Sequence, residues 1–212
     1  MIKLNNQIIY LILLRHGESQ WNLENRFTGW TDIDLTENGE EEAKNAGILI
    51  RESNINLDFV YVSRLKRAIK TSRICLNQLK KVNVETFCDW RLNERHYGSL
   101  QGLNKTETAK KYGASKVHAW RRSYDISPPK IDEKDKRHPK LDIMYRDIDP
   151  AKLPNGESLK DTLKRVKPLW LGEIFTQIKK HKNLMIVAHG NSLRSIVKML
   201  KNINDKEIIK LN

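Results

Sequence analysis

The sequence has little cysteine and no long apolar run. Among its 212 residues only Cys75 and Cys88 are cysteines, too few for a disulfide framework or a four-ligand zinc site, so we expect a reducing compartment, the cytoplasm. The longest apolar run, residues 8–14, is far shorter than the roughly 20 residues of a membrane-spanning helix. Its flanks lack the pattern of a secretory signal. Because no internal repeat or flexible linker interrupts the chain, we expect a single domain over residues 1–212.

Negative charge is also scarce. Against 39 Lys and Arg residues there are 26 Asp and Glu residues, which gives a net charge of +13. An excess of this kind is typical of proteins that bind nucleic acid or another polyanion. However, Lys outnumbers Arg, and Asn and Ile are abundant, a bias that A/T-rich coding alone would produce. Hydrophobic residues at 39% and charged residues at 31% indicate a soluble globular protein rather than a disordered one.

Three short apolar segments predict strands. They span residues 8–14, 57–62 and 184–188, and each ends in a polar segment. Continuous apolar runs of this length are typical of strands that are buried on both faces of a parallel sheet. Segments with helical periodicity lie between them. The alternation predicts an α/β fold with a mainly parallel central sheet flanked by helices.

The helical segments have recognisable starts. Short polar side chains at a helix start accept hydrogen bonds from the free N–H groups of the first turn, and such side chains precede four segments: Thr36, Ser63, Asn104 and Ser158. A last helix is expected after Asn191, and Gly113 is expected to end the third one. Pro168 predicts a bend in the fourth helix. Cys75 falls on the apolar stripe of the second helix, so we expect it in the core.

Arginine and histidine side chains follow the predicted strands. Arg15 and His16 come after the first strand, Arg67 after the second, and His189 after the third. In open α/β sheets, ligands bind beyond the carboxyl ends of the strands, where helix N-termini present free N–H groups. A neutral imidazole can attack phosphorus and carry the phosphoryl group covalently, while fixed arginines stabilise the charge of the transferring group. The pattern therefore predicts phosphoryl transfer.

Glycines and a carboxyl group would complete this chemistry. Gly17 and Gly190 would let a phosphate approach the backbone closely, and a hydroxyl substrate needs a carboxyl group to exchange its proton. The arrangement requires no metal. The other histidines do not show the spacing typical of metal ligands. They are His96, His118, His138 and His181.

Several motifs together resemble those of one enzyme family. They lie at residues 14–19, 21–22, 25–30, 63–67, 92–98, 100–105, 120–122 and 188–194. This set is similar to that of the cofactor-dependent phosphoglycerate mutases, in the histidine phosphatase superfamily, over about residues 9–212. The Arg-His-Gly motif alone marks only the superfamily, whereas the block from Glu94 to Tyr97 and the pair Arg121-Arg122 are more specific.

The resemblance implies a role for each matching residue. His16 would be the phosphorylated nucleophile and Glu94 the general acid and base, with Arg15, Arg67 and His189 completing the catalytic set. The substrate would be bound by Gly17, Glu18, Ser19, Gln20, Trp21, Asn22, Thr28, Gly29, Arg95, His96, Tyr97, Lys105, Arg121, Arg122, Gly190 and Asn191. Residues 123–150 form a charged insertion with little periodicity, long for a plain connection, and we expect a lid over the site.

The implied reaction is the interconversion of 3-phosphoglycerate and 2-phosphoglycerate in glycolysis and gluconeogenesis, primed by 2,3-bisphosphoglycerate and without metal. A bisphosphoglycerate synthase or a histidine-type phosphatase of the same superfamily is the alternative. A basic nucleic-acid-binding protein is a remote one, because the basic residues are scattered along the chain. The resemblance implies small phosphoglycerates as partners, no nucleic acid or membrane, and a homodimer or homotetramer. Mutases of this family continue beyond the helix near Lys201 into another strand and a C-terminal tail, so this tail is expected to be missing here.

Overall fold

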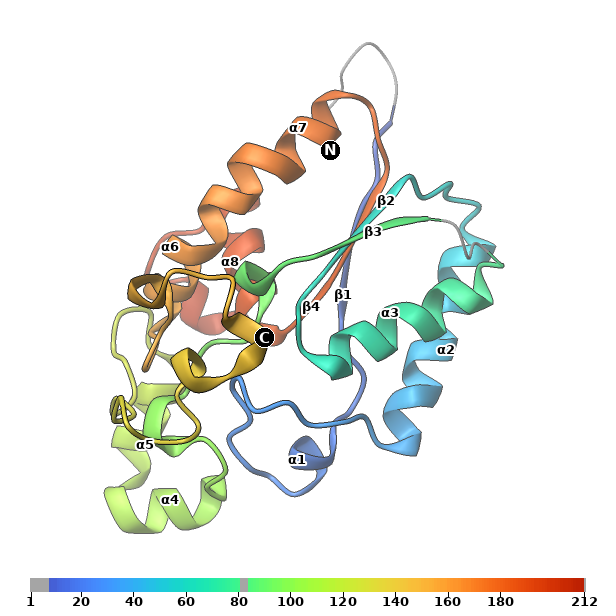
Figure 1. Ribbon diagram of the computed structural model, residues 1–212. Helices are drawn as coiled ribbons and strands as arrows, with labels where there is room; N and C mark the ends of the chain where they lie inside the picture. The colour runs from blue at the N-terminus through green and yellow to red at the C-terminus, as the bar shows by residue number, and fades with distance from the viewer. Residues whose placement is uncertain (1–7, 81–83, 212) are drawn as a thin grey trace.

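A parallel sheet forms the centre of the molecule (Figure 1). The computed structural model describes residues 8–80 and 84–211, and within them the strands lie in the order β1-β4-β2-β3, all parallel. Their bounds are Leu11–Arg15 for β1, Phe59–Val62 for β2, Glu85–Cys88 for β3 and Leu184–Ala188 for β4. The predicted α/β fold with a mainly parallel sheet is therefore confirmed.

Helices cover both faces of this sheet (Figure 1). One face packs against α2 (Glu37–Glu52) and α3 (Lys66–Gln78). The other packs against α6 (Leu159–Leu169), α7 (Phe175–Lys179) and α8 (Gly190–Lys201). Because side chains alternate along a strand, the central strand β4 contributes to both hydrophobic clusters.

The alternation along β4 is visible in the two clusters. Leu184, Ile186 and Ala188 pack on the side of α6, α7 and α8. Met185 and Val187 pack on the side of α2 and α3. All five side chains are fully buried, which explains the continuous apolar run that predicted this strand at its correct bounds.

Most predicted helix starts are confirmed. Thr36 accepts a hydrogen bond from the N–H of Gly39 at 3.0 Å, Asn104 accepts from the N–H groups of the first turn of α4, and Ser158 forms a capping box with Asp161. The prediction that Ser63 caps a helix is wrong, because α3 begins only at Lys66. The hydroxyl of Ser63 is instead engaged with a buried histidine, described below.

Other segments also differ from the sequence-based expectation. β1 begins at Leu11 rather than at residue 8, where Ile8 and Tyr10 are exposed, and β2 begins at Phe59 rather than at residue 57. β3 had no apolar signal because it is an edge strand with largely exposed residues. After Pro168, α6 passes into a π-helical turn, Trp170–Ile174, before α7; proline has no N–H to continue the regular hydrogen bonding.

The remaining helices lie beyond the sheet. They are α1 (Gln20–Leu23), α4 (Lys105–Tyr112) and α5 (Ala114–Arg122). Short 3-10 turns occur at Trp90–Leu92, Gly98–Leu100, Pro139–Leu141, Ile143–Tyr145, Pro150–Lys152 and Ile208–Lys210. None of the helices in the described residues has the length and apolar character to cross a membrane.

The insertion at residues 123–150 is fastened to the domain at identifiable points. Tyr145 packs with Trp30 and Leu153 in a small buried cluster. The guanidinium of Arg64 donates to the carbonyl of Met144 at 2.8 Å and to both carboxylate oxygens of Asp147. The insertion has little helical or strand periodicity because its described turns are short and its core contacts are few.

Candidate active site

A strongly basic cavity lies where β1, β4 and the loops beyond the sheet meet. Its volume is about 410 Å³, and its lining is Arg15, His16, Asn22, Arg26, Phe27, Thr28, Gly29, Arg67, Glu94, Tyr97, Lys105, Arg121, Arg122, Gly190, Asn191 and Arg194. Seven of these side chains are Arg or Lys, and Glu94 is the single acidic one among the described lining residues. Such a cavity suits a small ligand with several negative charges.

His16 follows β1 directly and is held in one tautomer. Its N–H bonds to the carbonyl of Ala188 at 3.0 Å, which continues the β1–β4 pairing. Its Nδ1 lies 2.6 Å from the carbonyl oxygen of Gly17. Because a carbonyl oxygen can only accept, Nδ1 carries the hydrogen and Nε2 keeps a free lone pair. Burial, together with the charge of Arg67, lowers the pKa of His16 well below its usual value, so the ring is neutral at pH 7.

His189 lies next to His16 and directly precedes α8. The two ring centroids are 4.9 Å apart, and Nε2 of His189 lies 2.7 Å from the hydroxyl of Ser63. Burial and the nearby charge of Arg67 lower the pKa of His189 well below its usual value. Its Nδ1 is buried and has no hydrogen-bond partner among the described residues. If Ser63 donates to Nε2, Nδ1 carries a hydrogen that an anion can accept.

Arg67 is a buried charge without a full set of partners. Its guanidinium donates to the carbonyls of Gly29 at 2.8 Å and Thr31 at 3.0 Å, while its Nε has no partner among the described residues. Burial lowers the pKa of Arg67 to about 10, so it still carries a positive charge at pH 7. Glu94 and Asp32 are the carboxylates whose charges act on Arg67, but no ion pair with it is formed within residues 8–80 and 84–211. A buried cation without an ion pair favours an anionic ligand.

More cations gather elsewhere in the cavity. Burial lowers the pKa of Lys105, and the positive charges of Arg121 and Arg15 lower it further. These three side chains come from the start of α4, the end of α5 and the end of β1. Their mutual repulsion would be relieved by a ligand with two anionic groups.

Glu94 has one carboxylate oxygen fixed and one available. Oε1 accepts hydrogen bonds from the N–H of Arg95 at 2.7 Å and from the N–H of Asn191 at 3.2 Å. The other oxygen, Oε2, lies close to Gly190, since a Cβ added to that glycine would be 3.8 Å from it. The geometry therefore leaves Oε2 to exchange a proton with a ligand hydroxyl.

Several residues of the predicted site are not among those that line the cavity. They are Gly17, Glu18, Ser19, Gln20, Trp21, Arg95, His96 and His189. The hydroxyl of Ser19 donates to Asn22, and the carboxylate of Glu18 accepts from Thr36 at the start of α2. Arg26 stacks on the ring of Trp21, with its guanidinium carbon 4.1 Å from the centroid. Ser19 and Trp21 therefore contact Asn22 and Arg26, which line the cavity.

Gly17 has a different role from the expected one of admitting phosphate. A Cβ at this position would lie 2.1 Å from the carbonyl oxygen of Gly39, near the start of α2. Glycine is required here because the backbone after β1 touches the backbone of α2. Gly190, in contrast, does line the cavity.

Arg95 and His96 are fully buried beside Glu94. Arg95 donates to the hydroxyl of Tyr97 at 3.1 Å and to the carbonyl of Arg121 at 2.7 Å, so it holds two lining residues. His96 accepts from the N–H of Gly98 through Nδ1. Burial lowers the pKa of His96 to about 3, which keeps the ring neutral.

Three lining residues were not predicted: Arg26, Phe27 and Arg194. Arg26 bonds the carbonyl of Gly102 and the carboxylate of Glu24. Arg194 donates to the side chain of Asn191 and to the carbonyl of Ile208. Its position three residues after Asn191 places both on one face of α8, and this spacing was the available signal.

No group of three or more His, Cys, Asp or Glu side chains is placed to hold a metal within residues 8–80 and 84–211.

Comparison with known proteins then decides the family. Residues 11–137 and 130–212 match the histidine phosphatase superfamily (branch 1). A protein from Bacteroides thetaiotaomicron named 2,3-bisphosphoglycerate-dependent phosphoglycerate mutase 2 is 54% identical over 202 residues. The chain belongs to the phosphoglycerate mutase family of this superfamily.

Another relative agrees with this assignment. A protein from Elusimicrobium minutum named 2,3-bisphosphoglycerate-dependent phosphoglycerate mutase is 54% identical over 204 residues. Each of the two alignments covers 95% of this chain and 82% of the length of the relative.

Solved structures show the same fold at lower identity. The mycobacterial glucosyl-3-phosphoglycerate phosphatase is 22% identical, with a TM-score of 0.72 over 95% of this chain and 84% of that one. YhfR from Bacillus stearothermophilus is 24% identical, with a TM-score of 0.67 over 93% and 82%. The arrangement of the sheet and helices is thus that of the histidine phosphatase fold.

Proposed function

We propose that this chain interconverts 3-phosphoglycerate and 2-phosphoglycerate through a phosphohistidine at His16. The observation that carries the proposal is the pairing of a neutral His16, whose Nε2 is free, with a basic cavity containing Glu94. The names of the relatives support the choice of substrate. By the same family relationship we propose a cytoplasmic homodimer or homotetramer.

The charges in the cavity fit a bisphosphoglycerate. Two phosphates and a carboxylate carry roughly four to five negative charges at pH 7. Arg15 and Arg67, which line the cavity, would hold the phosphoryl group beside His16. The buried Nδ1 of His189, which has no partner among the described residues, would be a further donor. The carboxylate and the distal phosphate would be bound by Tyr97, Lys105, Arg121 and Arg122. When bound, 2,3-bisphosphoglycerate supplies the phosphoryl group that primes His16.

The residues then divide the chemistry between them. Nε2 of His16 forms a bond to phosphorus as the bond from phosphorus to the substrate oxygen breaks, and Oε2 of Glu94 gives that oxygen its proton. In the reverse direction Glu94 accepts the proton of the attacking hydroxyl while His16 is released. Arg15 and Arg67 stabilise the charge on the phosphoryl oxygens throughout.

Water must be kept from the phosphohistidine, and we propose residues 123–150 as the cover. The insertion begins directly after the substrate-binding pair Arg121-Arg122. All of its residues are described by the structure, and none lines the cavity. The proposed cover would therefore act by moving toward the cavity when substrate is bound.

The phosphohistidine can be tested directly. After incubation with 2,3-bisphosphoglycerate carrying labelled phosphate, we expect an acid-labile label on His16. The label should be lost in His16→Ala and kept in His118→Ala, which removes an exposed histidine of α5. A metal chelator should not change the labelling. A label on serine, or none in a well-folded protein, would contradict the proposal.

Conversion of labelled 3-phosphoglycerate separates the mutase from its alternatives. A mutase yields 2-phosphoglycerate, whereas a phosphatase yields glycerate and inorganic phosphate. A synthase accumulates 2,3-bisphosphoglycerate.

A further inference from the structure

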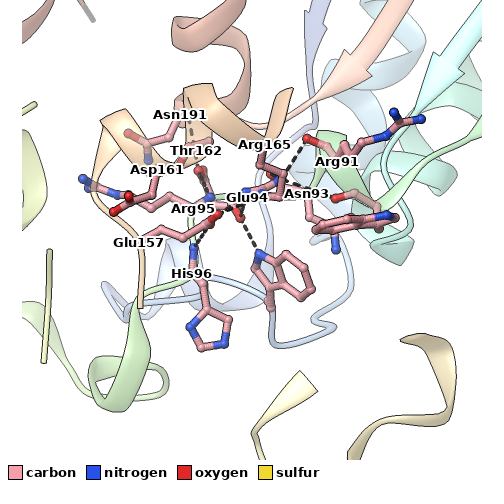
Figure 2. Close-up of polar contacts among 12 residues, drawn as sticks. Arg91, Asn93, Glu94, Arg95, His96, Glu157, Asp161, Thr162, Arg165 and Asn191 are labelled. Atoms are coloured by element: carbon pink, nitrogen blue, oxygen red, sulfur yellow. Dashed lines mark hydrogen bonds and ion pairs between the residues drawn. The ribbon is translucent and has the colours of Figure 1, made fainter. Parts of the chain in front are cut away.

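A buried ion pair lies behind the segment that carries Glu94 (Figure 2). Arg165 of α6 contacts Glu157, which precedes that helix, through Nε–Oε1 at 2.7 Å and Nη2–Oε2 at 2.8 Å. Their side chains are only 6% and 4% exposed. The proposed chemistry uses neither of them, and neither lines the cavity.

The guanidinium of Arg165 also donates hydrogen bonds to four backbone carbonyls between residues 90 and 94. Its Nη1 donates to the carbonyls of Trp90, Arg91 and Asn93 at 3.3, 2.8 and 3.2 Å. Its Nη2 donates to the carbonyl of Glu94 at 3.2 Å. A guanidinium is planar and rigid, so these bonds fix the carbonyls relative to α6.

Glu157 holds the other side of the same segment. Its Oε2 accepts a hydrogen bond from the N–H of His96 at 2.8 Å. The ion pair therefore binds the backbone before Glu94 through Arg165 and after it through Glu157. Trp30 adds a bond from its Nε1 to the carbonyl of Glu94 at 2.6 Å, and the Arg165 guanidinium carbon lies 5.4 Å from the Trp30 ring centroid.

An ion pair of this kind is not needed for stability alone. Apolar side chains of similar volume often replace buried ion pairs without loss of stability. Apolar side chains could not donate hydrogen bonds to the four carbonyls that Arg165 binds. They also could not accept one from the N–H of His96 as Glu157 does. These contacts determine where the main chain of Glu94 lies, and therefore where its free Oε2 points.

We propose that Arg165, with Glu157, is a positioning residue for the proton transfer by Glu94. It sets the backbone so that Oε2 of Glu94 reaches the oxygen that leaves phosphorus or attacks it. This inference rests on the proposed role of Glu94 in the reaction.

The test compares two phosphoryl donors that differ in their need for a proton. When His16 attacks 2,4-dinitrophenyl phosphate, the phenolate departs without a proton. When it attacks 2,3-bisphosphoglycerate, the alkoxide must receive one from Glu94. The rate of His16 phosphorylation is measured for each donor in single-turnover experiments with the full chain.

The variants are chosen to separate proton transfer from general damage. Arg165→Lys keeps the charge opposite Glu157 but has too few donors for the carbonyls. We expect phosphorylation by 2,3-bisphosphoglycerate to fall about 100-fold, the size of effect that a misplacement of about 1 Å can cause. Phosphorylation by the dinitrophenyl ester should stay near the wild-type rate. The matched control is Arg91→Lys, which alters an arginine of the same segment whose side chain contacts Asp89 and Glu173.

Combination with Glu94→Gln gives a second measurement. If Arg165 acts through Glu94, Arg165→Lys should not slow phosphorylation of His16 further once Glu94 is replaced, because the carboxyl group that Arg165 positions is then absent. The two effects on the rate are therefore expected to be non-additive. Where Arg165→Lys does not fold, the double variant Arg165→Met/Glu157→Gln removes both charges together and is compared in the same way.

The outcomes distinguish the two proposals. No phosphohistidine from either donor would overturn the proposed function. Equal losses for both donors in Glu94→Gln would overturn its role as acid and base. A selective loss in Glu94→Gln, with no loss or an equal loss for both donors in Arg165→Lys, would overturn the positioning role alone.

Discussion

At the scale of single residues, the proposed reaction depends on keeping His16, the proposed nucleophile, neutral in a basic cavity. His16 and His189 lie side by side, and burial and the charge of Arg67 act on both in the same direction. The carbonyl of Gly17 orients the His16 ring without adding a negative charge nearby. In the proposed reaction Arg67 would therefore have two roles, since it would bind the anion and it also disfavours the imidazolium form, which could not attack phosphorus.

The protonation of His16 can be followed by NMR of the free protein with labelled histidine. We expect the His16 ring to remain neutral from pH 8 down to pH 6, since its pKa lies well below 6.5. In Arg67→Gln the pKa should rise, because one positive charge is removed, while burial still keeps it low. Half-protonation near pH 6.5 in the wild type would contradict this expectation.

At the scale of secondary structure, the end of β1 is joined to the start of α2 by backbone contact. A Cβ on Gly17 would collide with Gly39, and a Cβ on Gly39 would lie 2.1 Å from the carbonyl oxygen of Glu18. The two glycines let the strand and helix approach, which in turn places His16 against the carboxyl end of β4.

Gly17→Ala tests this contact. We expect the free energy of unfolding to fall by about 1–3 kcal/mol, as for other overpacked positions, with a loss of His16 phosphorylation. The matched control is Gly172→Ala, where nothing lies within 4 Å of the added Cβ; in a helical turn it should be neutral or stabilising by roughly 0.5–1 kcal/mol. Urea denaturation measures both. Equal stabilities of the two variants would show that α2 can shift without cost.

The same scale shows how far the sequence predicts this molecule. β4 was predicted at its correct bounds because both of its faces are buried, whereas β3 was missed because an edge strand carries no such pattern. Arg15, His16 and Arg67 could be grouped because they follow strands whose carboxyl ends meet at one edge. Arg165 and Glu157 could not be grouped, since their role depends on contacts with carbonyls more than 60 residues away. The Ser63 prediction failed because tertiary contact with His189 outweighed local capping.

At the scale of the whole molecule, the net charge of +13 is only partly explained by the site. Arg15, Arg67, Lys105, Arg121 and Arg122 account for five of these positive charges, which leaves most of the excess on the rest of the chain. That surplus can attract anionic substrates at long range, an effect that salt screens. The net charge predicts an anionic ligand, and the residues at the strand ends predict phosphoryl transfer.

Buried neutral histidines also make the stability of the fold depend on pH. The pKa values of His16, His96 and His189 are lowered in the folded state by burial, whereas in the unfolded chain they return to about 6.5. The unfolded chain therefore binds more protons below pH 6.5, and stability present above that pH is lost as the pH falls. Each group contributes about 1.4 kcal/mol per pH unit between its two pKa values.

Urea denaturation at pH 7, 6 and 5 measures this loss. The decrease should be smaller in His96→Asn, which removes one of the three groups from a position outside the cavity lining. A stability that stays constant over this range would contradict the burial of neutral histidines.

The central position of β4 has a consequence for partly opened forms of the molecule. β4 pairs with β1 on one side and β2 on the other, and its side chains are fully buried, so its amides should be among the last to exchange with solvent. His16 and His189 are attached to this most persistent part, whereas Lys105, Arg121 and Arg122 belong to α4 and α5, beyond the sheet. Under the proposed mechanism, local opening of α4 and α5 would leave a molecule that still takes up a phosphoryl group but no longer retains the glycerate. Water would then replace the hydroxyl acceptor, and the proposed transferase would become a hydrolase with the same proposed nucleophile, His16.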